Sequence, residues 1–374
     1  MTKRLLALAF AFALGFGVFE AGMRVVGGSE AAPAFQRLFM QDPRIGHRLR
    51  PGERTHYSTP EFAADIAINS DGVRGEELGP KPPGERRIAI LGDSLVLSVQ
   101  VDLATTFCAQ LERHLNASAT TRTRVINGGV QGYGPVEELL FYRHVVSRLH
   151  PDIVLVFVFV ANDAIESIDS APKLTADPNN VAPATDDAQF FLRRMVRRSM
   201  VLQTVRLRVN EVLDWMRPEA APSLSRPLST YATNPPAEVA KGMQITRDVL
   251  ATLQREAAAR GTRLGIVLIP ARLQLNDLDF SYMQASARAA GQELIRDAAT
   301  KRFTTALAPL GVPMLDLLPV LKAQPDPAGL FYKENIHLTP RGHEVVGRAL
   351  AEFVGSAFAS PAPGTAPAPH AGRE

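Results

Sequence analysis

A continuous apolar segment from Ile153 to Val160 constrains the fold of this chain more than any other feature. All of its residues are hydrophobic, and β-branched and aromatic side chains predominate in it. Parallel strands that are covered by helices on both faces have this uninterrupted pattern, because neither face of the strand meets water. The segment therefore predicts a buried strand in a parallel sheet.

Shorter apolar segments recur along the chain and alternate with helical patterns. The other expected strands are Arg87–Leu91, Thr123–Ile126, Leu264–Ile269 and Pro313–Leu315. The expected helices are Ala104–Leu115, Val136–Leu149, Ala237–Arg260, Tyr282–Ala306 and Thr339–Phe353, the last with Thr339 as N-cap and Pro340 at its first position. This alternation predicts a doubly wound α/β domain with a mostly parallel five-stranded sheet and helices on both faces. Ligands of such sheets bind beyond the carboxyl ends of the strands.

The chain divides into segments of different character. Residues 28–86 are rich in turn residues, with a hairpin expected around Phe62–Ile68, and residues 87–357 form the expected α/β domain. Residues 358–374 are rich in Pro and Ala and are expected to be disordered. Within the domain, residues 170–236 interrupt the alternation and predict an insertion with one amphipathic, arginine-rich helix. This helix is expected to pack on the domain with a solvated basic face, and a lid over the site or a membrane-surface element is the alternative.

Residues 1–27 combine a basic start with an apolar run. Lys3 and Arg4 precede the run, which extends from Leu5 to Phe19. The run is shorter than the ~20 residues that a membrane-spanning helix needs, and no A-x-A cleavage pattern follows it. A signal anchor is therefore favoured over a cleaved signal peptide, with a buried core helix as the remaining alternative. Both signal types predict export of the rest of the chain, because basic residues favour the cytoplasmic side.

Composition excludes several classes of protein. Hydrophobic residues make up 46% of the chain, which excludes a disordered polypeptide. The 41 basic and 38 acidic residues nearly balance, so no electrostatic attraction to nucleic acid is expected. The single cysteine, Cys108, excludes an intrachain disulfide and a cysteine-ligated zinc cluster.

Polar motifs follow the expected strands and precede the last expected helix. Ser94 follows the first strand, the glycine-rich segment Asn127–Gly134 follows the second, and Asn162 follows the third. Glu334 and His337 stand just before the last helix. Each motif taken singly is more often an ordinary turn or surface residue. Because all of them fall at one edge of the sheet, they supply together a nucleophile, backbone donors, a side-chain donor and an acid–base pair, the groups needed for acyl transfer through a serine ester.

The combined motifs resemble those of the SGNH (GDSL) hydrolase superfamily, which is named for its Ser, Gly, Asn and His. The resemblance implies that Ser94 is the nucleophile and His337 its base. It also implies an oxyanion hole formed by the backbone amides of Ser94 and Gly132 and by the side chain of Asn162. Acyl transfer of this type requires no metal and no organic cofactor, so none is expected.

The resemblance covers roughly residues 87–170 and 262–355, and the chain departs from the family pattern in two places. Glu334 stands where the family has an Asp three residues before the His, so Glu334 is the expected triad acid with one extra methylene. Val160 occupies a position that is usually Gly in the third motif and is expected to narrow the site. The segment Asn69–Arg74 is similar to one found in exported, membrane-anchored bacterial members.

The main functional hypothesis is a serine esterase that removes an acetyl or other short acyl group from a carbohydrate or lipid. The first alternative is an O-acyltransferase that acts on an exported polysaccharide, and the second is an inactive scaffold or binding subunit of the cell envelope. The expected partners are an ester-bearing small molecule or glycan and, through the N-terminal helix, a membrane. The catalytic domain is expected to lie in the periplasm or outside the cell, either anchored to the membrane or secreted after signal cleavage.

Overall fold

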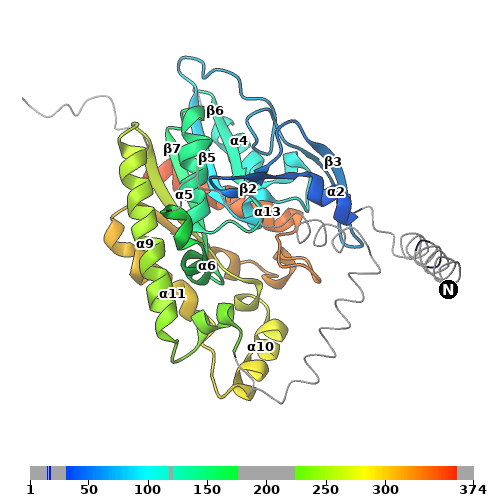
Figure 1. Cartoon of the computed structure of the whole chain (residues 1–374), viewed down its shortest axis with the longest axis vertical. Helices are drawn as coiled ribbons and strands as arrows, with labels where there is room; N and C mark the ends of the chain where they lie inside the picture. Colours follow the sequence, from blue (N-terminus) through cyan, green and yellow to red (C-terminus); the bar gives the residue numbers. More distant parts are fainter. Residues whose placement is uncertain (1–14, 16, 18–30, 118–120, 176–223, 360–374) are drawn as a thin grey trace, which may run out of the picture.

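A computed structural model describes residues 15, 17, 31–117, 121–175 and 224–359 of the chain. Its centre is a five-stranded parallel sheet with the strand order β6-β5-β7-β8-β9 (Figure 1). The strands are β5 (Arg86–Gly92), β6 (Thr123–Gly129), β7 (Ile153–Phe159), β8 (Arg263–Ile269) and β9 (Met314–Asp316). In this order β6, the second strand of the sheet along the chain, lies at the edge beside β5, the first. This is the flavodoxin-like doubly wound arrangement. The expected α/β fold is therefore confirmed.

The central strands owe their position to continuous apolar sequence. Every residue of β7 is buried, as the run from Ile153 predicts. The strand β6 continues three residues beyond the expected end at Ile126, through Gly128 and Gly129. Gly129 has no room for a side chain, because a Cβ there would lie 2.1 Å from the backbone nitrogen of Leu97. The glycines of this segment thus allow the chain that follows β5 to pack directly on β6.

Two groups of helices cover the sheet (Figure 1). The helix α4 (Phe107–Asn116) packs against α13 (Pro340–Ala357), and α9 (Ala237–Ala258) packs against α5 (Pro135–His144) and α6 (Asp163–Ser170). The chain leaves β5 toward β6 and then returns to β7 on the other side, and right-handed crossovers in opposite directions place the two groups on opposite faces. Thr339 accepts a hydrogen bond from the Gly342 N–H at 3.3 Å, as expected of the N-cap of α13.

Two expected helices differ from the structure. The pattern over Tyr282–Ala306 forms two helices, α10 (Asp277–Ala289) and α11 (Ala298–Leu307). Between them the chain is extended, because the N–H of Thr233 donates to Glu293 O at 2.7 Å and the N–H of Ile295 donates to Tyr231 O at 2.8 Å. The pattern over Val136–Leu149 ends as a helix at His144 and continues as a 3₁₀ turn. The remaining short elements near the sheet are α3 (Ser94–Leu97) and α12 (Leu317–Lys322).

The segment before β5 forms a helix and two antiparallel hairpins. These elements are α2 (Ala31–Arg37), β1 (Phe39–Asp42), β2 (Gly46–Leu49), β3 (Arg54–Ser58) and β4 (Ala63–Ala67). The second hairpin includes the expected Phe62–Ile68 segment. Apolar residues of this part, among them Leu38, Ile45 and Ile66, belong to the same hydrophobic core as the central sheet.

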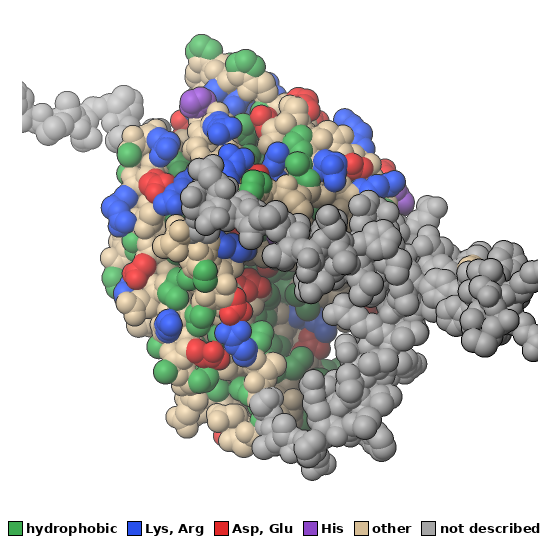
Figure 2. Space-filling view, in the orientation of Figure 1, with side chains coloured by type: hydrophobic (Ala, Val, Ile, Leu, Met, Phe, Trp, Pro, Cys, Tyr) green, Lys and Arg blue, Asp and Glu red, His purple; other side chains and the backbone are tan. Residues whose placement is uncertain are grey.

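Several expected segments lie outside the described residues. They are the N-terminal apolar run, the arginine-rich helix of the insertion and the Pro/Ala-rich tail. The described end of the insertion contains a 3₁₀ turn, Arg226–Tyr231, whose Tyr231 is fully buried. Within the described ranges, no helix has both the length and the apolar character that crossing a bilayer requires. On the face shown in Figure 2, basic and acidic side chains are interspersed, as the near balance of charges predicts.

Candidate active site

Ser94 lies directly after β5, at the first residue of the short helix α3. The side chain of Asp93 accepts a hydrogen bond from the Leu95 N–H at 2.8 Å and so caps this helix. Gly92 is needed at the bend, because a Cβ there would lie 2.3 Å from Cγ2 of Val96. Ser94 is 5% exposed, and its backbone N–H donates to no other described residue. The sharp turn therefore holds the Ser94 hydroxyl at the carboxyl edge of the sheet.

The glycine-rich segment lies beside this turn because β6 is the parallel neighbour of β5. The side chain of Asn127 joins the two, since it donates to Val96 O at 2.8 Å and accepts from the Gly129 N–H at 3.0 Å. Gly132 follows with a φ of +70°, a conformation that favours glycine. Its N–H has no acceptor among the described residues. The amides of Gly132 and Ser94 are thus available to a ligand at this edge.

Asn162 comes from the end of β7, where it precedes α6. Its amide nitrogen donates to Oε1 of Glu166 at 2.7 Å, while its Oδ1 is buried and has no partner among the described residues. An amide nitrogen carries two hydrogens, so one remains for a second acceptor. The contact with Glu166 orients that remaining donor.

Buried carboxyl groups surround this part of the site. Burial raises the pKa of Asp93 to about 6 and that of Glu166 to about 8. Burial, followed by the charges of the neighbouring carboxylates, raises the pKa of Glu138 and of Asp163 well above the usual range. Glu166 is therefore largely protonated at neutral pH. The upward shifts at all four carboxyl groups reduce the negative charge that would oppose an oxyanion forming nearby.

His337 lies in a loop between Phe331 and Leu338, which pair as an antiparallel bridge. The side-chain oxygen of Asn335 accepts from the His337 N–H at 3.1 Å and also contacts Nδ1 of the ring. Because an amide oxygen only accepts, this contact places the ring proton on Nδ1 and leaves the lone pair on Nε2. Nε2 is buried and has no partner among the described residues, and burial lowers the pKa of His337 to about 4. The ring is therefore neutral at pH 7 and in the tautomer of a general base.

The structure does not bring Glu334 to His337, contrary to the expectation for the triad acid. The Glu334 side chain is exposed, and within the described residues no hydrogen bond or ion pair joins it to the His337 ring. Asn335 takes this place because its side chain closes a short turn onto the N–H two residues later, a common property of Asn. That turn brings the same oxygen against Nδ1. The Asn-x-His spacing was a signal present in the sequence, and it was missed because the family pattern directed attention to position 334.

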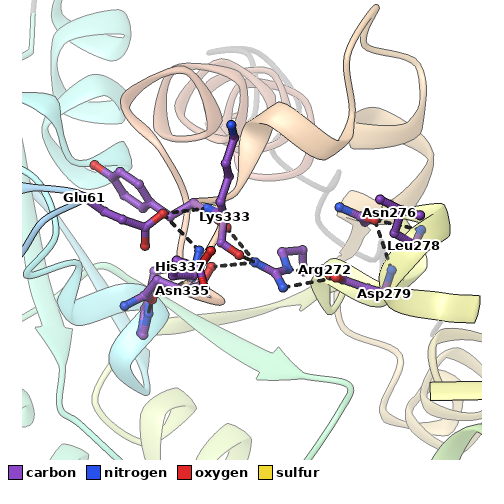
Figure 3. Close-up of polar contacts among 10 residues, drawn as sticks. Glu61, Arg272, Asn276, Leu278, Asp279, Lys333, Asn335 and His337 are labelled. Atoms are coloured by element: carbon purple, nitrogen blue, oxygen red, sulfur yellow. Dashed lines mark hydrogen bonds and ion pairs between the residues drawn. The ribbon is translucent and has the colours of Figure 1, made fainter. Parts of the chain in front are cut away.

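Two further side chains hold the loop that carries His337, and Figure 3 shows them approaching it from opposite sides. Nη1 of Arg272 donates to the carbonyl oxygen of Tyr332 at 2.7 Å and contacts that of Lys333, while Nη2 donates to Asp279 at 3.1 Å. From the other side, Oε1 of Glu61 accepts from the N–H groups of Lys333 and Glu334, both at 2.9 Å. No local pattern in the sequence marked Arg272 or Glu61.

One hydrogen bond connects the loop of His337 with the chain that follows α3. The Tyr332 hydroxyl donates to Gln100 O at 3.3 Å, a link between the residues that follow α3 and those that precede His337. Among the described residues, Ser94 and His337 themselves form no hydrogen bond, as is common in enzymes without bound substrate. Val160 is fully buried, so its side chain belongs to the core. The described residues contain no group of three or more His, Cys, Asp or Glu side chains suited to a metal ion.

The groups described above are of the kinds that acyl transfer needs. They offer a hydroxyl, a neutral imidazole with a free nitrogen, and N–H donors that have no partner within the described residues. Such donors stabilise the negative charge that develops on a carbonyl oxygen.

Part of the chain matches a known protein family, and solved structures are similar to the chain in fold. Residues 229–369 match the family described as "SGNH hydrolase-like domain, acetyltransferase AlgX", a range that includes His337 and Asn335. The solved lipase/acylhydrolase from Enterococcus faecalis is similar with 14% identity and a TM-score of 0.40, covering 72% of this chain and 95% of that one. An acetylxylan esterase from Geobacillus stearothermophilus is similar with 15% identity and a TM-score of 0.37, covering 72% and 94%. No curated protein matches the chain in sequence. The family match covers less than half of the chain, and the five-stranded parallel sheet agrees with the expected α/β fold.

Proposed function

We propose that this protein is a serine-dependent O-acyltransferase that moves an acetyl or other short acyl group onto a carbohydrate hydroxyl. The observation that carries the proposal is the His337 ring, whose Nδ1 is held by Asn335 and whose Nε2 has no partner among the described residues. A histidine held in this way acts as a base toward a hydroxyl. The matched family, whose description names an acetyltransferase, supports transfer over hydrolysis.

The first half of the proposed reaction forms an acyl-enzyme. Nε2 of His337 takes the proton of the Ser94 hydroxyl while Oγ attacks the ester carbonyl. The carbonyl oxygen becomes an oxyanion that accepts hydrogen bonds from the amides of Ser94 and Gly132 and from the free hydrogen of the Asn162 side chain. When the tetrahedral intermediate collapses, the imidazolium gives its proton to the departing alcohol oxygen and the acyl group remains on Ser94.

The second half repeats these steps with the acceptor. A sugar hydroxyl gives its proton to Nε2 of His337 as its oxygen attacks the acyl carbon. Collapse breaks the bond to Ser94, whose Oγ takes the proton back, and releases the acylated sugar. Asn335 keeps the ring in the reactive tautomer in both halves, but as a neutral group it gives less stabilisation to the imidazolium than a carboxylate gives.

Ester hydrolysis is the second candidate, because water in place of the sugar hydroxyl follows the same course at the same groups. The third possibility, an inactive scaffold, was motivated by Glu334 at the position of the triad acid. Asn335 weakens the argument for an inactive scaffold, because it supplies a hydrogen-bond partner for the His337 ring. The proposal includes export of the domain, directed by residues 1–27 as a membrane anchor or as a cleaved signal peptide. Export would bring the domain to an exported polysaccharide.

The test uses the full-length protein with p-nitrophenyl acetate, with and without an unacetylated polysaccharide. Mass spectrometry of the glycan detects transfer, and p-nitrophenol release measures total turnover. We expect acetylated glycan with the native protein and none with Ser94→Ala, which should also lose covalent labelling by a fluorophosphonate. Release of p-nitrophenol without acetylated glycan would favour the esterase, and labelling that persists in Ser94→Ala would show that the nucleophile lies elsewhere.

A further inference from the structure

We infer that the segment before the α/β domain, residues 34–75, is a positioning part of the active site that clamps the three loops carrying Ser94, Gly132 and His337. This inference rests on the proposed function, because it assigns a role toward those groups. The clamp acts through three side chains, namely His47, Glu61 and Arg74. None of them belongs to the motifs that indicate acyl transfer.

Arg74 holds the turn that carries the nucleophile. Its guanidinium is 2% exposed, donates to Leu97 O at 2.8 Å and to Val101 O at 2.6 Å, and contacts Ser98 O. These carbonyl groups lie at and after the end of α3, where helix carbonyls lack internal partners. Ser98 has a φ of +58°, a strained conformation for a residue other than glycine. Arg74 therefore stabilises a strained turn that begins at Ser94.

Burial lowers the pKa of Arg74 to about 10, so the group is still charged at neutral pH. A buried charge of this kind is costly unless it is hydrogen-bonded, and its hydrogen bonds are to carbonyl oxygens of the Ser94 turn. The backbone of Arg74 also forms an antiparallel bridge with Asn127 of β6. Contacts with the sheet and with the Ser94 turn therefore both fix the position of Arg74.

His47 holds the loop that carries Gly132. Its Nε2 donates to Gln131 O at 2.8 Å, and the hydroxyl of Tyr133 donates back to His47 O at 2.6 Å. The two hydrogen bonds flank Gly132 on either side in the chain. Gln131 O belongs to the same peptide group as the Gly132 N–H, so the bond from His47 orients that N–H, and the bond from Tyr133 anchors the next side chain.

Glu61 holds the loop that carries His337. It lies in the turn between β3 and β4, and Oε1 accepts from the N–H groups of Lys333 and Glu334. Phe62, the next residue, packs its ring against that of Tyr332 with centroids 5.4 Å apart. The hairpin tip therefore contacts this loop through a polar and an apolar side chain.

A row of aromatic rings joins the contact points at Glu61 and His47. Neighbouring rings in the row have centroids between 5.1 and 5.9 Å apart, a range in which aromatic pairs attract. Its members in order are Tyr332, Phe62, Tyr57, Phe35, Phe39, His47 and Tyr133. The row begins in the loop of His337 and ends in the loop of Gly132. The row therefore connects the two loops through contiguous side-chain contacts.

The loops need such a clamp because they belong to distant parts of the chain and carry groups that react together. A displacement of about 1 Å between reacting groups can reduce a rate about 100-fold. The sheet alone aligns the ends of β5 and β6, whereas the His337 loop lies between α12 and α13, outside the sheet. The clamp adds a further connection between the proposed base and the oxyanion donors to the hydrogen bond of Tyr332 with Gln100.

Glu61 is the residue to test, because it lies at the surface and its loss does not leave a buried charge. In Glu61→Ala, we expect kcat for p-nitrophenyl acetate to fall about tenfold with KM nearly unchanged. The rate of fluorophosphonate labelling of Ser94 should fall in parallel. Glu61→Gln keeps an acceptor oxygen and should recover most of the activity. The control is Glu77→Ala, which removes a carboxylate two residues beyond the segment. Among the described residues this carboxylate accepts hydrogen bonds only from Ser70, so its loss should leave kcat unchanged.

Hydrogen exchange separates this inference from the proposed function. The Lys333 and Glu334 amides should exchange at least several-fold faster in Glu61→Ala than in the native protein or in Glu77→Ala. Faster exchange with unchanged kcat and labelling would overturn the clamp, and so would unchanged exchange. If the native protein neither turns over the ester nor labels at Ser94, the proposed function fails, and exchange still reports whether Glu61 holds the loop.

Discussion

Ser94 and His337 are held in place by different kinds of contact. The Ser94 turn is buried and packs backbone to backbone against Gly129. The His337 loop exposes Lys333 and Glu334 to solvent and is held by single side chains from elsewhere, shown in Figure 3. Segments with few buried contacts open at a lower free-energy cost than the core. The packing of the domain core therefore positions Ser94, the proposed nucleophile. A few separate hydrogen bonds position His337, the proposed base.

The largest effect is expected from a change that breaks the backbone packing under the nucleophile. In Gly129→Ala, the new Cβ would lie 2.1 Å from Leu97 N and 2.5 Å from the Val96 carbonyl carbon, which no side-chain rotation relieves. We expect the free energy of unfolding to fall by about 3 kcal/mol, measured by urea denaturation, together with labelling at Ser94. The matched control is Gly355→Ala in α13, where a Cβ meets nothing within 4 Å. Equal stability of the two variants would show that the turn is not held by packing.

The next largest effect concerns the side-chain donor at the end of β7. In Asn162→Ala, loss of one oxyanion donor should lower kcat by about 100- to 1000-fold. The melting temperature should change little, because the residue is only partly buried. Steady-state kinetics with p-nitrophenyl acetate and a thermal melt give both quantities. A decrease of less than about tenfold would remove Asn162 from the oxyanion hole.

The pH dependence of the reaction tests the base. His337 must be neutral to act, and burial lowers its pKa to about 4, so kcat/KM should fall only as the pH drops toward that value. Asn335→Asp places a carboxylate against Nδ1, which favours the imidazolium and raises the pKa of His337 by about 1–3 units. The acidic limb of the kcat/KM profile should therefore move to higher pH. If the acidic limb of the kcat/KM profile lies at the same pH in the native protein and in Asn335→Asp, residue 335 does not contact the His337 ring in solution.

The smallest effect is expected at the second support of the loop. In Arg272→Lys, a single ammonium cannot bind Asp279 and the carbonyl of Tyr332 in the way the planar guanidinium does. We expect kcat to fall about threefold with little change in KM. Arg288→Lys, which changes an exposed arginine paired with Glu293, serves as the control. If both variants retain full activity, Arg272 is dispensable and Glu61 alone supports the loop.

Much of the fold follows from local patterns. The sequence predicts the buried strand β7 and the alternation of strands and helices. A continuous apolar run indicates an element buried on all sides, and a periodic pattern indicates one buried on a single face. The prediction of one helix over Tyr282–Ala306 is wrong, because a helical periodicity does not reveal that residues 293–295 pair with residues 231–233. That pairing joins segments that are distant in sequence and overrides the local preference.

The sequence by itself determined the α/β architecture and the positions of Ser94, Gly132 and Asn162 after the ends of three strands, since both depend on periodicity and on the order of strands. Only the tertiary structure decided that Asn335 contacts the His337 ring, while Glu334 is exposed and its N–H binds Glu61. The physical reason is that a side chain one position away in the loop points in a different direction, and contacts between residues 61 and 334 arise only when the hairpin packs on the finished domain.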